Sequence, residues 1–201
     1  TYYKAYESHQ YTYSALLAGS IKKDLFYSQA KNFSSYRTKA LFSENISAEV
    51  YDNLIESVHQ NLDPLYKYFG LRKRLLKLDA LHMYDCSVPL VEGIKWHMSF
   101  EQAVEEIRTA LEPLGKEYVE QVTRGLTLDR WTDRYENKGK RSGAYSSGCY
   151  DSNPFILMNY REDNINSVYT LAHEAGHSMH SLYSRKNQPY LYSDYTIFVA
   201  E

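Results

Sequence analysis

Apolar residues recur at helical spacing through the first part of the chain. Tyr6, Tyr13 and Leu17 share one face of such a helix. Gly19 follows this pattern and predicts the end of the helix, with a second short helix after it. The opening of the chain is therefore expected to be helical but interrupted.

Serine and proline mark further helix boundaries. Ser47 can cap the apolar pattern that follows it, since its hydroxyl can accept a hydrogen bond from a free N–H of the first turn. Ser99 and Gln102 form a capping box at the start of another helix. Pro64 and Pro113 each predict a break or a first turn between helices. These boundaries indicate a succession of short helices.

The pattern changes beyond residue 125. Stretches rich in Gly, Ser and Asn at 137–143 and 146–148 surround short segments that contain Tyr, and they predict the turns of a small sheet. Residues 155–160, opened by Pro154, are expected to form a short apolar strand. The predicted fold class is therefore mainly α-helical with a small β-sheet.

A long helix is expected next, capped by Asp163 or Asn164 and ending before Gln188 and Pro189. At about 100° per residue, its positions divide into an apolar stripe and a face of imidazoles. The stripe consists of Val168, Leu171, Ala172, Ala175, Met179 and Leu182. The opposite face carries His173, His177 and His180. One face is expected to pack on a core and the other to line a cleft.

Composition excludes several classes of function. Of the 201 residues, 43% are hydrophobic and 24% are charged, which is typical of a globular protein with one domain or one domain plus a small addition. The net charge of −2 comes from interspersed charges, so neither nucleic acid nor a membrane is an expected partner. The 21 tyrosines favour packing at half-buried surfaces over a tyrosine-lined cleft.

Cys86 and Cys149 lack the spacing of a metal site and favour a reducing compartment. The sequence has neither a signal-peptide pattern nor an apolar run long enough to span a membrane. Thr1 stands at the start in place of Met, and the first residues already follow a helical pattern. The chain is therefore expected to be a fragment, incomplete at both ends.

The segment His173-Glu174-Ala175-Gly176-His177 carries the clearest chemistry. Histidines at i and i+4 share a helix face, with Cβ atoms about 5–6 Å apart, so both imidazoles can bind one zinc ion. Glu174 points about 100° away from His173, where it can contact a water held by the metal and act as general base. Hydrolysis of a peptide or amide needs these groups. The long helix and its apolar stripe favour this interpretation over an accidental motif on a solvated helix.

A catalytic zinc ion commonly has three protein ligands and one open position. A third His placed six residues after His177 is excluded, because that residue is Tyr183. Asp194 can instead cap a helix of residues 195–201 that returns Glu201 to the metal. His180 lies on the same face as His177 and is interpreted as a group that supports the ligands, with a cleft-lining residue or a substitute ligand as the alternatives.

Several segments form a recognisable set in the expected order. They are residues 84–85, 88–90, 143–146, 155–159, 173–180 and 198–201. Together they resemble the oligoendopeptidase F group of the thimet oligopeptidase-like family of zinc metallopeptidases, and the resemblance covers most of the chain. It implies a mostly helical, zincin-type metallopeptidase with a deep substrate channel, a cytoplasmic location and cleavage of short peptides.

Residue by residue, the resemblance places one zinc ion on His173, His177 and Glu201 and the catalytic carboxylate on Glu174. It also implies a loop and edge strand along which an extended peptide can add main-chain hydrogen bonds. The expected substrate contacts there are Gly143, Ala144, Tyr145, Ser146 and Gly148. An ordinary structural hairpin is the alternative for this region.

Residues 1–128 are expected to form part of the channel wall, and residues 129–201 a partial catalytic core with the sheet, the motif helix and the start of the third-ligand helix. Members of the resembled family are longer and carry downstream Tyr and His residues that stabilise the developing oxyanion. Two hypotheses follow: a zinc-dependent endopeptidase that hydrolyses short oligopeptides, or a metal- or peptide-binding fragment without turnover. The sequence does not predict an oligomeric state.

Overall fold

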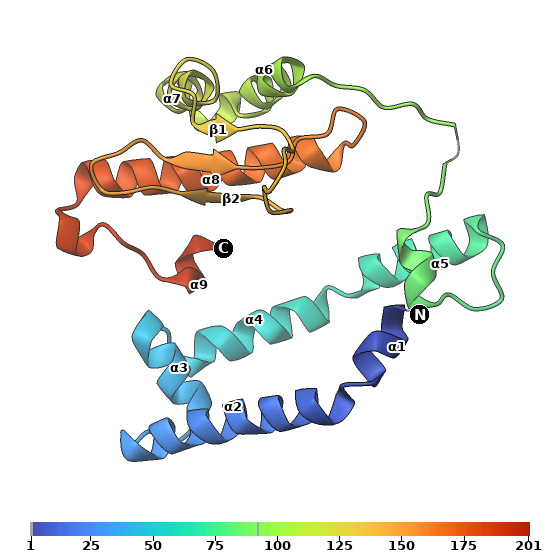
Figure 1. Cartoon of the computed structure of the whole chain (residues 1–201), viewed down its shortest axis with the longest axis vertical. Coiled ribbons are helices and arrows are strands. Elements are labelled where there is room, and N and C mark those ends of the chain that lie inside the picture. The colour runs from blue at the N-terminus through green and yellow to red at the C-terminus, as the bar shows by residue number, and fades with distance from the viewer. Residues whose placement is uncertain (1, 92) are drawn as a thin grey trace. The chain divides into compact units, whose positions relative to one another are not determined.

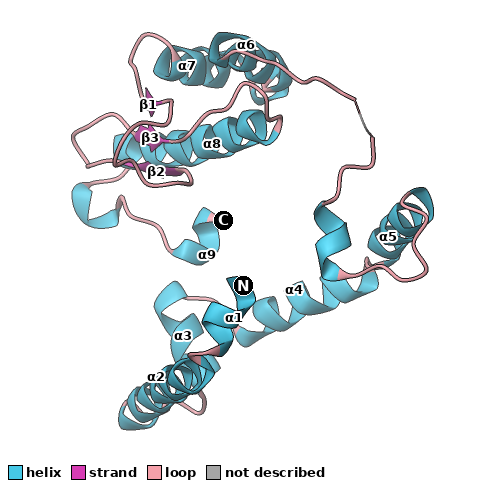
Figure 2. Cartoon of the chain, turned by 45° about the vertical axis from the view of Figure 1, so that its right-hand side comes forward, coloured by secondary structure: helices cyan, strands magenta, loops and turns pink. Residues whose placement is uncertain are grey.

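The computed structural model describes residues 2–91 and 93–201 (Figure 1). The chain divides into two compact units, Thr1–Leu90 and Val91–Glu201. Helices dominate both units in the described residues, and the second unit holds one three-stranded sheet (Figure 2). The predicted fold class is confirmed. Within the same residues, each helix is either too short or too polar to cross a membrane.

The N-terminal unit is built from helices alone in the residues described. These are α1 (Tyr2–Glu7), α2 (Gln10–Ala30), α3 (Tyr36–Glu44), α4 (Ala48–Gln60), α5 (Asp63–Leu75) and the 3₁₀ helix η1 (Met83–Ser87). The Ser47 hydroxyl accepts from the Val50 N–H at the start of α4, and Pro64 lies in the first turn of α5. Both boundaries agree with the sequence prediction.

Helix α2 continues through Gly19, so the helix end predicted there is wrong. A glycine inside a helix costs about 1 kcal/mol relative to alanine, which is too little to end a helix that is otherwise well formed. The interruption lies earlier, at Ser8 and His9. The Ser8 hydroxyl donates to the Ala5 carbonyl over 2.8 Å and competes there with the helical backbone pattern.

The C-terminal unit begins with a helical hairpin and continues into the sheet and the long helix. Its elements are α6 (Phe100–Ala110), η2 (Glu112–Leu114), α7 (Lys116–Leu126), β1 (Thr132–Asp133), β2 (Tyr145–Ser147), β3 (Phe155–Leu157), α8 (Asn166–Asn187), η3 (Tyr190–Tyr192) and α9 (Ile197–Ala200). The strand order is β1-β3-β2, with β1 parallel and β2 antiparallel to β3. Strand β2 is therefore an edge of this sheet.

Helix α8 lies along one face of the sheet, and α6 and α7 pack beside it (Figure 1). Leu171, Ala175 and Met179 are fully buried there, which confirms the predicted apolar stripe. They belong to a core that also contains Phe100, Ala103, Val104, Ile107, Val122, Leu126, Trp131, Ile156, Met158 and Tyr160. Burial of this stripe fixes the rotation of α8 about its axis, and so decides which residues face the opposite side.

Helix α7 ends against the largest of these core side chains. A Cβ atom at Gly125 would come within 2.4 Å of the Trp131 ring, so this position accepts only glycine. The Trp131 N–H donates to the Gly125 carbonyl over 2.9 Å. This close approach turns the chain from α7 into β1 and seats Trp131 in the core.

Two helix starts show how far capping residues can be predicted. At α6, the Ser99 hydroxyl accepts from the Gln102 N–H, and the Gln102 side chain accepts from the Ser99 N–H, as expected. At α8, the residue before the helix is Ile165, so neither Asp163 nor Asn164 occupies the capping position. The Asn164 side chain still accepts a hydrogen bond from the Asn166 N–H over 3.0 Å. It does so from the position before the capping residue, Ile165.

The boundary between the compact units lies at Leu90 and Val91, so α6 and α7 share a unit with α8 and the sheet. The division predicted at residue 128 concerns a different property, since it separates a channel wall from a catalytic core. Compactness does not test that functional division, which stays a prediction.

Candidate metal centre

Two imidazoles meet on the exposed side of α8. The Nε2 atoms of His173 and His177 lie 2.9 Å apart, and the two rings stand nearly perpendicular, with an angle of 88° between their planes. Residues at i and i+4 face each other on a helix, and the buried stripe on the other side holds this face outward. Local helix geometry therefore accounts for both positions.

Glu201 approaches the same point from the C-terminal end of the chain. Its Oε2 lies 3.9 Å from Nε2 of His173 and 3.9 Å from Nε2 of His177. Across residues 2–91 and 93–201, these three side chains form the one group of His, Cys, Asp or Glu that could hold a metal ion. Their assignment as ligands stays a prediction, but the structure brings them together.

The donor set fits zinc in both chemistry and spacing. Two imidazole nitrogens and one carboxylate oxygen are a donor set of catalytic zinc sites. Donors about 2.0–2.1 Å from a tetrahedral ion lie about 3.3 Å from one another. The separations of 2.9 Å and 3.9 Å lie on either side of this value.

The helix that carries the chain to Glu201 begins later than predicted. Thr196 precedes α9, which spans Ile197–Ala200, so Asp194 does not cap it and Tyr195 lies outside it. Asp and Thr are both suitable capping residues, and the local sequence does not choose between them. Tertiary contacts of Ser193 and Tyr195 with α8 decide the outcome, because they hold these residues in an irregular segment.

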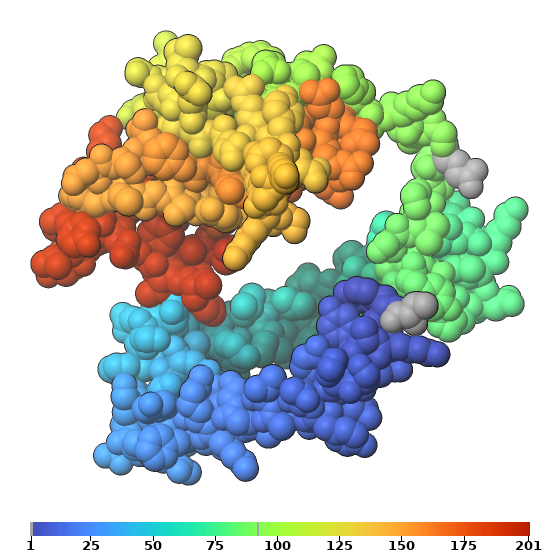
Figure 3. All heavy atoms as spheres, viewed as in Figure 1, coloured from blue at the N-terminus to red at the C-terminus, as the bar shows by residue number. Residues whose placement is uncertain are grey.

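A pocket of about 550 Å³ surrounds the cluster. It is lined by Ala144, Tyr145, Ser146, His173, Glu174, His177, Ser181, Tyr195, Ile197, Ala200 and Glu201. Figure 3 shows the C-terminal segment, drawn in red, lying against the orange part of the same unit. Glu174 is buried, with 7% of its surface exposed, yet it borders this pocket next to His173. A carboxylate, a pair of imidazoles and a strand edge therefore share one cavity.

Three of the five predicted substrate contacts, Ala144, Tyr145 and Ser146, line this pocket, while Gly143 and Gly148 do not. The two glycines flank β2 instead. Gly143 adopts a φ of +96°, which L-residues rarely adopt. These glycines set the direction in which the chain enters and leaves the edge strand.

Side chains from α8 and from the segment after β3 hold this loop in place. Asn159 Nδ2 donates to the Arg141 and Gly143 carbonyls over 2.9 and 3.0 Å. The hydroxyls of Ser146 and Ser178 lie 2.8 Å apart. Ser178 is completely buried and follows His177 directly. The helix that presents the imidazoles therefore also fixes the distance to β2.

His180 lies outside the cluster that could hold a metal ion among the residues described. Its ring stacks on Tyr195, with centroids 3.7 Å apart and 7° between the planes. Sequence reasoning did not single out Tyr195 or Ser178. Helical phase could have directed attention to Ser178, but no local signal pairs Tyr195 with His180, since the intervening chain leaves the helix and returns.

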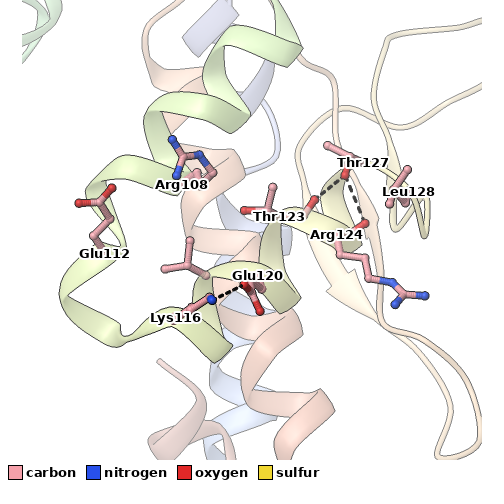
Figure 4. Close-up of a pocket in the computed structure, with 9 residues that line it drawn as sticks. Arg108, Glu112, Lys116, Glu120, Thr123, Arg124, Thr127 and Leu128 are labelled. Carbon is pink, nitrogen blue, oxygen red and sulfur yellow. Dashed lines mark hydrogen bonds and ion pairs between the residues drawn. The ribbon is translucent and has the colours of Figure 1, made fainter.

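A second hollow, of about 680 Å³, lies on the α6–α7 hairpin (Figure 4). Its rim carries surface charges such as Lys116 and Glu120, whose charged atoms are 3.6 Å apart. None of the described residues that line it belongs to the candidate metal cluster. The residues described as lining this hollow include neither histidine nor cysteine, so the α8 pocket is the stronger candidate for a metal-dependent site.

Comparisons with known proteins agree on one family. The model of peptidase family M3 matches residues 1–201. The chain is 48% identical over 199 residues to "Oligopeptidase PepF" of Bacillus subtilis, covering 99% of this chain and 29% of that protein. It is 46% identical over 200 residues to an "Oligoendopeptidase F homolog" of Borreliella burgdorferi, covering 100% of this chain and 34% of that one.

A solved structure shows the same fold. A crystal structure of a candidate peptidase from Chlamydophila abortus superposes with a TM-score of 0.79 at 46% identity, over 98% of this chain and 32% of that chain. The chain thus spans about a third of the length of the relatives it matches.

Proposed function

The chain belongs to peptidase family M3, and we propose that it forms the metal-binding part of a zinc-dependent endopeptidase that hydrolyses short oligopeptides. One observation carries the proposal. The side chains of His173, His177 and Glu201 converge within a single pocket that Glu174 also borders. The names of the relatives, oligopeptidase and oligoendopeptidase, agree with this chemistry.

His173, His177 and Glu201 would hold one zinc ion through two Nε2 atoms and one carboxylate oxygen. A zinc ion in such a site lowers the pKa of a water and polarises the carbonyl that is attacked. The protein's own contribution is to hold the three donors within reach of each other. The buried stripe of α8 supplies this rigidity for the two histidines, because rotation of the helix would expose the core.

Glu174 would act as general base. It follows the ligand His173 directly, so its carboxylate leaves the helix about 100° away from that imidazole and borders the pocket. From there it can accept a proton from the attacking water and donate it to the departing amine. Its burial keeps bulk water from competing for the same proton.

The edge strand β2 would bind the substrate backbone. It pairs with β3 on one side through the register Ser146↔Ile156, and no other described strand pairs with its second edge. An extended peptide can add to such an edge through main-chain hydrogen bonds, which favours short flexible substrates over folded proteins. The pocket residues Ala144, Tyr145 and Ser146 place this edge beside His173 and Glu174.

Three further parts of the proposal concern the wider protein. Residues 1–128 would contribute to the wall of the substrate channel, outside the catalytic core of 129–201. The reaction would take place in the cytoplasm, in agreement with the free thiols of Cys86 and Cys149. The second candidate function is metal or peptide binding by the 201-residue chain without turnover.

Glu174→Gln in the full-length protein tests the proposal, and hydrolysis that the same change abolishes in the 201-residue chain alone would exclude the second candidate. With a quenched fluorescent peptide as substrate, kcat is expected to fall about 10²- to 10⁴-fold, because the general base is lost. Zinc content is expected to remain that of the unsubstituted protein. Glu117→Gln, an exposed position on α7, is the matched control and should leave kcat unchanged.

Two outcomes would contradict the proposal. Full hydrolysis in a zinc-free preparation that resists chelators would exclude the metal mechanism. Unchanged kcat in Glu174→Gln would exclude the general base, and no turnover in the unsubstituted protein with zinc bound would favour the binding-only alternative.

A further inference from the structure

The segment that leads back from α8 to Glu201 is fastened to α8 by a distinct set of contacts. The Tyr195 ring stacks on His180, with centroids 3.7 Å apart and only 7° between the planes. The Tyr195 hydroxyl lies 2.6 Å from the Ser181 hydroxyl. One turn further along α8, the Ser184 hydroxyl donates to the Ser193 carbonyl. Ser193 is a buried residue. We name His180, Ser181, Ser184, Ser193 and Tyr195 the return clamp.

The short helix α9 cannot place Glu201 unaided. It has four residues, and a single turn of isolated helix is unstable in water because its nucleation is unfavourable. Ile197 and Val199 on this helix are 72% and 58% exposed, so these two side chains give it little packing, while Phe198 is 36% exposed. The position of Glu201 therefore depends largely on where the chain is anchored before α9, and the return clamp is that anchor.

Three residues of the clamp, His180, Ser181 and Ser184, lie on the same helix as the two histidine ligands. His180 and Ser181 follow His177 by about one helical turn, which corresponds to about 5 Å along the axis. A chain fixed at this point of α8 enters α9 at a set distance from His173 and His177. Glu201 then lies 3.9 Å from both Nε2 atoms.

We propose that Tyr195, held by the His180 ring and the Ser181 hydroxyl, is a positioning residue that sets the metal affinity of the site through Glu201. This inference rests on the proposed zinc site. It assigns His180 the role of an aromatic platform rather than of a substitute ligand, because one face of its ring is covered by Tyr195. Tyr195 acts on the metal only by fixing the third ligand.

The test measures the zinc affinity of the full-length protein by competition with a chromophoric chelator. Tyr195→Ala removes the stack and the hydroxyl contact and is expected to weaken zinc binding about 10- to 100-fold, as loss of groups that orient ligands does. Tyr195→Phe keeps the stack and is expected to cost only about threefold to tenfold. Tyr192→Ala, an exposed tyrosine of the same segment, is the matched control and should leave the affinity unchanged.

A double-mutant cycle separates positioning from general loosening. In a Glu201→Ala background, Tyr195→Ala is expected to have no further effect, since the ligand on which it acts is gone. An equal loss in both backgrounds would overturn the proposal, because Tyr195 would then act on α8 itself. The same cycle run with Tyr195→Phe and Ser181→Ala uses milder changes, so the result does not depend on whether Tyr195→Ala folds.

His180 provides the rescue experiment. His180→Phe preserves an aromatic platform and should retain most of the affinity, whereas His180→Ala should lose it. Equal losses of affinity in both variants would show that the imidazole itself is needed and would exclude the aromatic platform.

If Glu201→Ala leaves zinc affinity unchanged, both the assignment of Glu201 as third ligand and the proposed role of the clamp are wrong. If Glu201→Ala weakens zinc binding but Tyr195→Ala does not, the positioning role of Tyr195 is wrong, whereas the proposed zinc site is supported.

Discussion

The two faces of α8 contact different parts of the molecule. On one face Leu171, Ala175 and Met179 are fully buried against α6, α7 and the sheet. On the other face the His173 side chain is 58% exposed, and it meets residues that come from β2 and from the C-terminal end of the chain. The first face serves stability, and the second brings reactive groups together.

This difference separates what a mutation should do on each side. Loss of a buried apolar side chain leaves a cavity and weakens the whole unit. Loss of an exposed imidazole removes a proposed ligand but little packing, so the metal-free fold should remain. Stability without metal and affinity for metal are therefore expected to respond independently.

The largest effect is expected on the exposed face. His173→Ala should reduce kcat/KM for a short peptide at least about 10³-fold, since metal stabilisation of the reaction amounts to several kcal/mol. Stability without zinc should change by less than about 0.5 kcal/mol, as for other exposed positions. In calorimetry, zinc at about 100 times its Kd should stabilise the unsubstituted protein by about 2.7 kcal/mol. The same zinc concentration should not stabilise the His173→Ala variant. A large loss of metal-free stability in His173→Ala would contradict the claim that stability depends on one face of α8 and metal binding on the other.

The second effect belongs to the buried face. Leu171→Ala should lower the free energy of unfolding by about 2–5 kcal/mol, because Leu171 is completely buried and its loss leaves a cavity. Zinc affinity of the molecules that remain folded should be unchanged. Urea unfolding measures the first quantity and chelator competition the second. Tyr169→Ala, at a position 69% exposed on the same helix, is the control and should be nearly neutral.

The sequence predicts the buried face well and the exposed face only in part. The apolar stripe of α8 repeats within one helix, so periodicity alone placed Leu171 and Met179 in the core. The pair of imidazoles follows from the same helical geometry. Glu201 and Ala144–Ser146 reach the pocket from remote segments. The need for a third ligand pointed to Glu201, whereas the proximity of Ala144–Ser146 to His173 could be expected only from resemblance to known peptidases.

The errors in the prediction have a common physical cause. Gly19 and Asp194 were assigned boundary roles from local preferences worth about 1 kcal/mol each. Helix α2 continues through the glycine, and the contacts of Tyr195 with α8 delay α9 until after Thr196. Small local preferences were outweighed by the rest of the helix in one case and by tertiary contacts in the other.

A smaller effect should appear where the two faces are joined. Ser178 is buried next to the proposed ligand His177, and its hydroxyl lies 2.8 Å from that of Ser146 on β2. Ser178→Ala should cost about 1–2 kcal/mol of stability, because Ser146 loses its partner. If β2 binds substrate, KM for a peptide should rise about threefold to tenfold while zinc affinity stays the same. The double variant with Ser146→Ala should cost less than the sum of the single changes.

The smallest effect is expected at a polar group in the core, the hydroxyl of Tyr160. The Tyr160 hydroxyl donates to the Met98 carbonyl over 3.0 Å, so Tyr160→Phe should cost about 1 kcal/mol at neutral pH. Burial raises the pKa of Tyr160 above its ordinary value, and the nearby Glu162 carboxylate raises it further. The unfolded chain then loses the phenolic proton first as the pH rises. The stability that this pKa shift contributes is complete below about pH 10 and disappears as the pH passes through the pKa of the folded state. Urea unfolding of both proteins between about pH 8 and pH 12 should show their difference in stability shrinking with pH, and a constant difference would exclude a buried phenol that resists ionisation.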